Sequence, residues 1–448
     1  MLEAILPTIV LLSVLILIHE LGHFVAAKSV DIEVHRFSLG MGPRVLGFRV
    51  GETEFVLSAL PIGGYVSMAG MAGDEGASAL EGGGDAPHEP SPRDFDAKPL
   101  WARVWVVSAG VLMNLLFAVL VFALIPLFYG ERIDPTREIV VDTRTLPAAA
   151  APLAQVPFGA EITTVNERPV ATWNEVTRAL IEAGTGAITL QFADAPAVTF
   201  RMPVQDSLRA AVLGAIRPVY EPVLGQVRSG EAAAAAGLLP GDRIVAAAGE
   251  PIRTWWEFQD AIRAHPGVPL PLEVERGAER VSLTVTPSAE REPGLGVERI
   301  GRLGVAPDVQ VIHRSVGPGE AMQRGVQDTW QYSRTIVAFL GNLFTGQESP
   351  RQVGSVITIG QLSGEFARAG LQPFLWFMAV FSINLAVLNL LPIPILDGGH
   401  LMFMAIEAVR GRPLSVEQRV RFSHVGLIIV VGIMVWALTN DVLRVFGI

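Results

Sequence analysis

The chain has 448 residues, of which half are hydrophobic and 17% are charged, and its formal net charge is −10. The negative charge argues against nucleic acid as a partner. Since the sequence contains no cysteine, a disulfide framework, a thiolate metal site and a cysteine nucleophile are all excluded. This composition suits a protein that lies partly in a lipid bilayer and partly in water.

Four segments are long and apolar enough to cross a bilayer as helices, which takes about 20 residues. Basic residues gather in the segments that join spans one and two and spans three and four, so we expect both of these segments on the cytoplasmic side. Both termini and the long segment between spans two and three then lie outside the cytoplasm. The predicted spans are 1–28, 104–128, 374–400 and 425–445.

The first span contains the sequence His-Glu-Leu-Gly-His, beginning at His19. Its two histidines are four residues apart and therefore share one face of a helix. Two histidines at this spacing, with a glutamate directly after the first, are typical of a zinc site in which Glu20 is the general base. Burying three ionisable groups in a span is costly unless they are paired or bind a metal. We therefore interpret His19 and His23 as metal ligands and not as structural histidines.

A catalytic zinc needs a third protein ligand and an open position for water. Asp397 is the first acidic residue after a long uncharged run that ends the third span. Spans one and three both run inward, so their carboxyl ends should lie at similar depth. Pro392 and Pro394 should break the helix just before Asp397, which we predict to be the third ligand. His400 is the rival for this role.

These two motifs together resemble the site-2 protease family of intramembrane zinc proteases. The resemblance is carried by His-Glu-Leu-Gly-His and by Asn-Leu-Leu-Pro-Ile-Pro-Ile-Leu-Asp-Gly, which begins at Asn389, and it covers essentially the whole chain. In the second span the family often has Gly-Pro-x-x-Asn, whereas this chain has Gly110-Val-Leu-Met-Asn114. The resemblance implies a Zn²⁺ cofactor with the ligands His19, His23 and Asp397, the catalytic residue Glu20, and the substrate-binding residues Asn384 and Asn389.

The resemblance also implies a function. We expect an endopeptidase that cleaves single-span membrane proteins in regulated intramembrane proteolysis, with anti-sigma factors or signal-peptide remnants as the type of substrate. It would lie in the bacterial cytoplasmic (inner) membrane, with its active site near the cytoplasmic face. Two alternatives remain: a non-catalytic PDZ scaffold with structural zinc, and a zinc-dependent transporter. The first would usually need four protein ligands, and the second would need more polar residues in the other spans.

Between spans one and two, the sequence predicts a β-hairpin and then a linker. Two β-type runs, Val45–Val50 and Glu54–Leu60, flank a turn at Gly51 and Glu52. We expect the region 29–69 to be a membrane-associated hairpin whose edge can receive a substrate strand, although a simple surface hairpin is the alternative. The segment 70–99 is rich in Gly, Ala, Pro and acidic residues, which is typical of a flexible cytoplasmic linker.

The long outer segment contains an internal repeat with an offset of 82 residues, from Gly159 to Gly241. The second copy, with Gly-Leu-Leu-Pro-Gly-Asp, resembles PDZ domains of bacterial envelope proteases. We expect two PDZ-like domains, at 138–220 and 221–306, that either bind peptides or exclude bulky substrates. Trp173 and Trp255 should lie in their cores.

The segment 317–370 should form an amphipathic helical surface segment, with its aromatic residues used for packing. The predicted fold class is thus a polytopic α-helical membrane protein with four transmembrane helices, a membrane-associated β-hairpin and two extracytoplasmic PDZ-like α+β domains.

Overall fold

The computed structural model describes residues 2–71, 90–228, 230–291, 299–346 and 353–446. The chain forms two compact units. The first contains Met1–Gly130 and Ser315–Ile448, and the second contains Glu131–Arg314. The second unit is therefore inserted between two halves of the first.

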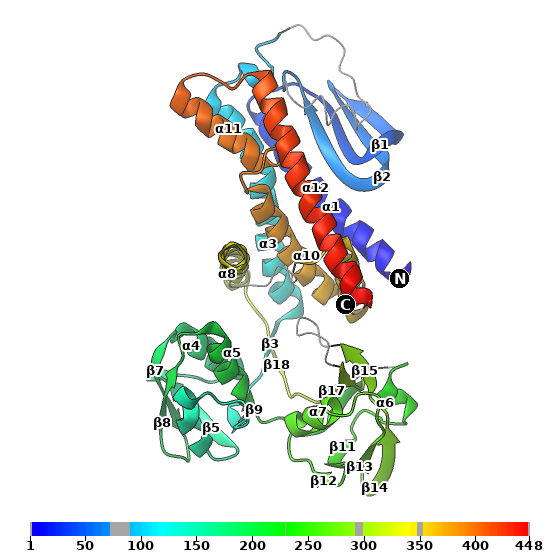
Figure 1. Ribbon diagram of the computed structural model, residues 1–448, viewed down its shortest axis with the longest axis vertical. Coiled ribbons are helices and arrows are strands. Elements are labelled where there is room, and N and C mark those ends of the chain that lie inside the picture. Colours follow the sequence, from blue (N-terminus) through cyan, green and yellow to red (C-terminus); the bar gives the residue numbers. More distant parts are fainter. Residues whose placement is uncertain (1, 72–89, 229, 292–298, 347–352, 447–448) are drawn as a thin grey trace. The chain divides into compact units, whose positions relative to one another are not determined.

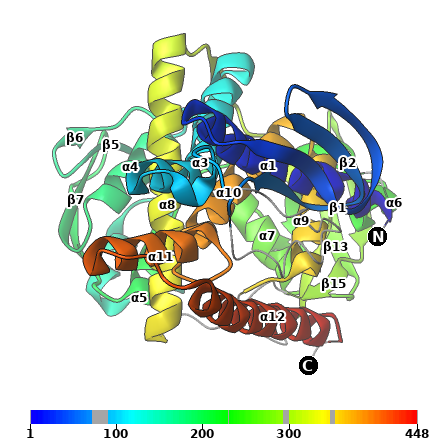
Figure 2. The same ribbon diagram turned by 90° about the horizontal axis from the view of Figure 1, so that it is seen from above.

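Within the described residues, the first unit contains four helices that are long and apolar enough to cross a membrane. By length and composition, they confirm the predicted number of spans. Helices α1, α3 and α10 pack against one another, and Figures 1 and 2 show them side by side. Apolar side chains such as Leu11, Leu15 and Phe377 fill the contacts between them. The four helices are α1 (Leu2–Ser29), α3 (Leu100–Tyr129), α10 (Leu371–Asn389) and α12 (Val416–Phe446).

The third span is not one helix from 374 to 400, so its predicted bounds were wrong, whereas the predicted break just before Asp397 is confirmed. Helix α10 ends at Asn389, and a separate helix, α11 (Asp397–Arg410), begins after an irregular segment. Pro392 and Pro394 lie in this segment, where each lacks the N–H that a helix would use. Ile395 has a φ of 115°, a conformation that costs a β-branched residue roughly 1–3 kcal/mol. The break therefore delivers Asp397 as the first residue of a new helix.

Residues 34–68 form the predicted hairpin, with its turn at Gly51 and Glu52. Its strands, β1 (Val34–Val50) and β2 (Thr53–Met68), extend well beyond the predicted runs. The first part of β1 pairs with β2 on both sides, since Phe37 lies opposite both Phe55 and Val66. The hairpin is therefore a curled sheet of four segments in the order 46–50, 53–57, 36–39 and 64–68.

The segment 90–99 packs against this sheet and α1, although it was predicted to be part of a flexible linker. It contains the short 3₁₀ helix η1 (Phe95–Ala97), whose Phe95 is buried in an apolar cluster. Arg93 donates two hydrogen bonds to Glu52, and together with Lys28 it lowers the pKa of Glu52 to about 2. The prediction was wrong here because one aromatic residue and one ion-pair cluster suffice to fix a polar segment. The rest of the predicted linker, 72–89, lies outside the described residues.

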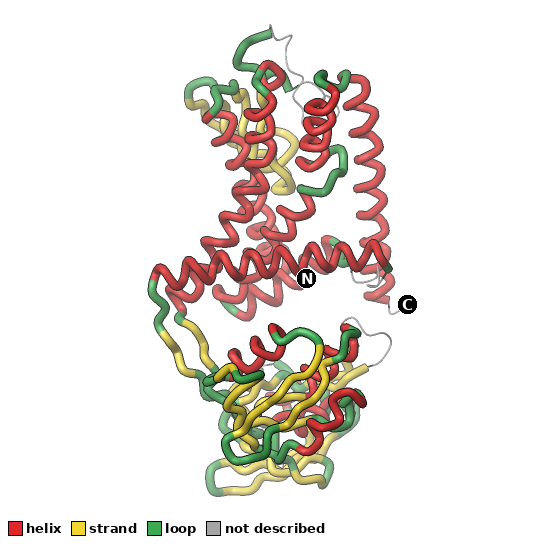
Figure 3. The backbone as a smooth tube through the Cα atoms, turned by 90° about the vertical axis from the view of Figure 1, so that its left-hand side faces the viewer, coloured by secondary structure: helices red, strands yellow, loops and turns green. Residues whose placement is uncertain are grey.

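Two helices occupy the predicted amphipathic segment, α8 (Pro318–Thr345) and α9 (Val356–Ala369). Helix α8 lies across the bundle in Figure 3 and packs on α3 and α10. Tyr332 stacks on Phe122, as expected for a packing residue, whereas Trp330 is 71% exposed and makes no such contact with the core. In a bilayer, this exposed ring would meet lipid or headgroups.

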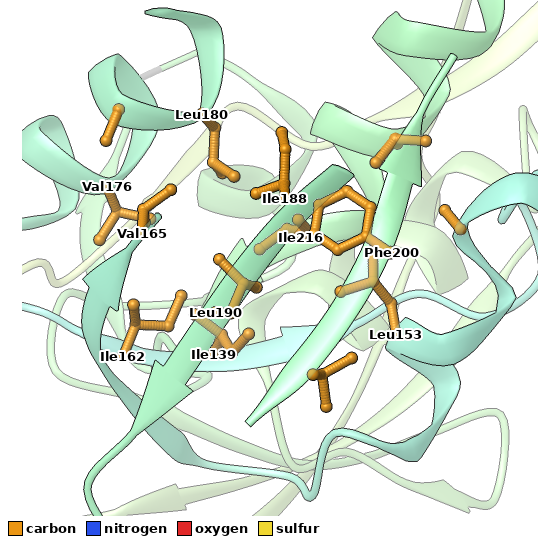
Figure 4. Close-up of a cluster of buried hydrophobic side chains, with 14 of the residues drawn as sticks. Ile139, Leu153, Ile162, Val165, Val176, Leu180, Ile188, Leu190, Phe200 and Ile216 are labelled. Atoms are coloured by element: carbon orange, nitrogen blue, oxygen red, sulfur yellow. The ribbon is translucent and has the colours of Figure 1, made fainter. Parts of the chain in front are cut away.

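The second unit contains two apolar cores. The first is built around Ile162, Leu190 and Phe200 (Figure 4), and the second around Phe258, Leu272 and Val274. The elements of the first half are β3 (Glu131–Ile133), β4 (Glu138–Val141), η2 (Ala148–Gln155), β5 (Ala160–Val165), β6 (Arg168–Pro169), α4 (Trp173–Glu182), β7 (Gly186–Phe192), β8 (Val198–Met202), α5 (Asp206–Ala215) and β9 (Ile216–Pro218). Those of the second half are β10 (Leu224–Val227), α6 (Ala232–Ala235), β11 (Arg243–Ala247), β12 (Glu250–Pro251), α7 (Trp255–Arg263), β13 (Leu270–Arg276), β14 (Glu279–Val285), β15 (Ser288–Arg291), β16 (Arg299–Arg302), β17 (Val305–Pro307) and β18 (Ile312–Arg314).

The two halves repeat one another in detail. Thr172 and Thr254, which are 82 residues apart, each cap a helix by accepting a hydrogen bond from the backbone of the glutamate three residues later. In each half a strand, a short strand, this helix and two further strands follow in the same order. Trp255 is buried in its core, and Trp173 is half-buried against its own.

Candidate metal centre

Helix α1 presents both histidines of the His-Glu-Leu-Gly-His sequence on one side. His19 and His23 are buried, each with 9% of the residue exposed, and their Nε2 atoms are 3.2 Å apart. Glu20 follows His19 directly, so it lies about 100° further round the helix, beside this pair. The helix thus brings three chemically active groups to one place.

Asp397 reaches the same place from α11. One of its carboxylate oxygens, Oδ2, lies 3.2 Å from Nε2 of His19, and the other, Oδ1, lies 3.6 Å from Nε2 of His23. The ligand atoms of the three residues all lie within 4.8 Å of one another, and among the described residues they form the one such group of potential ligands. The structure therefore brings together the three residues that were predicted as ligands from two distant segments.

The close approach of Asp397 depends on glycine. A Cβ atom on Gly398 would lie 2.3 Å from the carbonyl oxygen of Leu391, which is closer than any real contact allows. The first turn of α11 can therefore press against the irregular segment only if residue 398 has no side chain. The same packing holds Asp397 beside α1.

These residues fit a zinc ion. Oδ2 of Asp397 is buried and accepts no hydrogen bond of acceptable geometry, although a buried carboxylate oxygen without a donor or a cation is costly. Nδ1 of His23 lies 2.8 Å from the carbonyl oxygen of Val106, to which it must donate, so Nε2 carries the free electron pair. Two imidazole nitrogens and one carboxylate oxygen are a donor set of catalytic zinc sites, which leave further positions open.

The other predicted site residues lie in different surroundings. Nδ2 of Asn389 is 3.4 Å from Nε2 of His19, so this residue borders the ligand cluster. Asn384 is half-buried five residues earlier on α10 and faces about 140° away from Asn389. His400, the rival ligand, lies one turn beyond Asp397, where its ring contacts Phe403, and it is not part of the cluster.

Three residues of α3 contact the cluster but were not predicted as site residues. They are Val106, Gly110 and Asn114, and they lie against the two histidines. The sequence did carry a signal for two of them, since Gly110 and Asn114 form the part of the second span that resembles the family motif.

A helical membrane protein that has the sequence His-Glu-Leu-Gly-His in a span, and an aspartate as the third potential zinc ligand, belongs to the class of membrane-embedded metallopeptidases. The family model described as "Peptidase family M50" matches residues 7–433, and this chain belongs to that family. The resemblance to the site-2 proteases is thereby confirmed, and the protein is a peptidase.

Several relatives match nearly the whole chain. The "Regulator of sigma-E protease RseP" of Salmonella typhimurium is 34% identical over 97% of this chain and 97% of its own length. The protein of the same name from Escherichia coli is 33% identical, again over 97% of both chains. A protein of Pasteurella multocida whose name includes the words "zinc metalloprotease" is 34% identical over 97% of this chain and 98% of its own length.

Proposed function

We propose that this protein is an intramembrane zinc endopeptidase of the bacterial inner membrane that cleaves single-span membrane proteins in regulated intramembrane proteolysis. Anti-sigma factors or signal-peptide remnants are the type of substrate. The observation that carries this proposal is the cluster of His19, His23 and Asp397, in which both histidines and the adjacent Glu20 lie in a candidate span. A closed structural site would usually have a fourth protein ligand, and the described residues supply three, which favours an enzyme over a scaffold.

Each residue of the site has a role in peptide hydrolysis. Zinc, when bound by His19, His23 and Asp397, supplies a Lewis acid and lowers the pKa of water to about 7. Glu20 accepts a proton from the attacking water and delivers it to the leaving amine nitrogen. Asn389 donates its amide N–H groups to the carbonyl groups of an unwound substrate segment, whose helical partners are lost. We assign Asn384 to the same substrate path, about one and a half turns before Asn389 on α10.

The curled sheet offers an edge to the substrate at this site. Gly64 lies in the edge segment 64–68, and a Cβ atom on it would lie 3.2 Å from Cγ of Glu20 and 2.8 Å from Cγ2 of Ile16. This edge therefore runs past α1 at the level of the catalytic glutamate. A substrate strand that adds to it would hold an extended peptide beside Glu20, as a protease requires.

The second unit would act on access to the site. We assign its two repeats to PDZ-like domains outside the cytoplasm that act as a size filter, while the zinc lies near the cytoplasmic face. The charge distribution of the loops supports this orientation. The alternative function, a non-catalytic PDZ scaffold with structural zinc, would need only peptide binding by these repeats.

The test is the replacement Glu20→Gln in the full-length protein, co-expressed with a single-span membrane protein. We expect zinc content to stay at the wild-type level, because the ligands remain, and cleavage to fall by at least about 100-fold, because general base catalysis typically contributes 10²–10⁴-fold. Zinc is measured by mass spectrometry of the purified protein, and cleavage by the termini of the products. Glu417→Gln, at an exposed carboxylate on α12, is the matched control and should cleave normally. Near-full turnover by Glu20→Gln would show that Glu20 is not the base, and zinc binding without any cleavage by the wild type would favour the scaffold.

A further inference from the structure

Helix α3 contacts both ligand histidines along a single stripe. Nδ1 of His23 is 2.8 Å from the carbonyl oxygen of Val106, and Nδ1 of His19 is 3.3 Å from the side-chain nitrogen of Asn114. Val106 and Asn114 are eight residues apart and therefore lie on one face of α3, with Gly110 midway between them. The stripe matches the pair of histidines on α1, because the two helices run antiparallel at this contact.

Gly110 allows this approach. A Cβ atom at this position would lie 2.4 Å from Nε2 of His23 and 2.7 Å from Cε1 of His19. Any side chain at residue 110 would therefore displace an imidazole ring. On α1, Gly22 has the same relation to α3, since its Cβ atom would lie 2.3 Å from the carbonyl oxygen of Ala109. The two backbones are thus close enough for α3 to reach the Nδ1 atoms behind the ligand nitrogens.

The amide of Asn114 decides which nitrogen of His19 can bind a metal. Asn114 is fully buried, its Nδ2 faces Nδ1 of His19, and its Oδ1 is buried without a donor. If Nδ2 donated to Nδ1, a neutral imidazole would carry its proton on Nε2 and could not bind zinc there. Rotating the amide group of Asn114 by half a turn about its Cβ–Cγ bond instead brings Oδ1 to Nδ1 of His19. The buried oxygen then accepts a hydrogen bond, and Nε2 of His19 keeps its electron pair free for the metal. Since O and N of an amide are assigned from their hydrogen-bond partners, the second arrangement is the consistent one.

We infer that Asn114 is a positioning residue for the metal centre. Its side-chain oxygen accepts a hydrogen bond from Nδ1 of His19, just as the carbonyl oxygen of Val106 accepts one from Nδ1 of His23. Both imidazoles are then held by α3 as the tautomer with a free Nε2. Partners of this kind fix the ring orientation of ligand histidines, and their loss typically lowers metal affinity 10–100-fold. The inference rests on the proposed function only in that the metal bound is zinc.

The experiment compares zinc affinity in full-length wild type, Asn114→Leu and Asn114→Asp, measured by competition with a chelator in detergent solution. Leu is branched at Cγ as Asn is and offers no acceptor, so zinc affinity should fall 10–100-fold. Asp keeps an acceptor oxygen in place, so its affinity should stay within a few-fold of wild type. Ser382→Ala is the matched control, because Ser382 donates to the backbone carbonyl group of Asn114 without touching His19, and its zinc affinity should not change. Melting temperatures verify folding, and Asn114→Ala replaces the Leu variant if that variant does not fold.

Three outcomes would overturn the inference. Equal zinc affinities of wild type and Asn114→Leu would show that His19 needs no partner at Nδ1. An Asp variant that folds but binds zinc as weakly as the Leu variant would show that residue 114 does not act as an acceptor. A wild-type protein that binds no zinc would overturn the proposed function, and this inference with it, whereas the first two outcomes leave the proposed function intact.

Discussion

Asp397 is the residue on which the assembly of the metal centre depends most. It enters from a different helix than the two histidines, and its Oδ2 atom has no hydrogen-bond donor of its own. Replacing it with Asn keeps the shape of the side chain but removes the negative charge and one ligand oxygen. We expect Asp397→Asn to lower both zinc occupancy and cleavage, with occupancy measured on the purified protein by metal analysis.

His400→Ala is the control for this prediction, since His400 lies one turn further along α11 and outside the ligand cluster. It should retain zinc. If Asp397→Asn kept its zinc and His400→Ala lost it, the third ligand would be His400 and the geometry of the cluster would not be that of the metal-bound site.

The site residues on α1 could be predicted from sequence because their relation is local: a helix places residues 19 and 23 on one face whatever surrounds it. Asp397 could be predicted because an acidic residue after a long uncharged run is conspicuous. Asn114 could be noticed in a motif, but its contact with His19 could not be predicted. That contact depends on how α1 and α3 are rotated and shifted against each other, which no local pattern encodes.

At the scale of elements, α11 is also held by an ion pair at Glu407, near its carboxyl end. Arg103 on α3 donates two hydrogen bonds to Glu407, at 3.0 Å and 2.5 Å, and Arg103 is buried. Because the same helix begins with Asp397, this pair fixes the carboxyl half of α11 while the Gly398 contact fixes its start. The helix is thus anchored at the ligand-bearing turn and again near its carboxyl end.

We predict that Arg103→Met destabilises the protein by roughly 3–5 kcal/mol, since it leaves Glu407 as an uncompensated charge. The double variant Arg103→Met/Glu407→Met should be more stable than Arg103→Met alone, because both charges are then removed. The measurement is unfolding in detergent micelles for the wild type, both single variants and the double variant. Strictly additive effects would show that the two side chains do not interact.

The elements themselves were predictable to different degrees. The four spans and the turn at Gly51 follow from apolar length and from turn residues. The full strands β1 and β2 were not predicted, because they are apolar on both faces in places and lack a clear alternation. The break before Asp397 was predicted from Pro392 and Pro394, but the end of α10 as early as Asn389 was not, since the apolar run continues to Leu396.

At the scale of the whole molecule, the second unit is an insertion whose two ends meet. Strand β3, at its start, pairs with β18, at its end, so that Ile133 lies opposite Ile312. Arg314 and Glu131 add an ion pair with an N–O distance of 2.8 Å at the base of this ladder. In the sequence, both repeats lie between β3 and β18. A deletion of the repeats that keeps these two strands therefore leaves the two halves of the first unit connected.

We predict that deleting 138–306 leaves the metal centre intact and changes only the choice of substrate. The shortened protein should retain zinc and should cleave a single-span substrate with a trimmed outer domain about as well as the full chain does. It should also begin to cleave the untrimmed form, because the proposed size filter is gone while His19, His23, Asp397 and Glu20 all lie in the first unit. The measurement is cleavage of paired long and short substrates by both proteins in the same membranes. If the shortened protein kept its zinc but failed on the short substrate, the repeats would be docking modules that deliver the substrate, and the size filter would have to be abandoned.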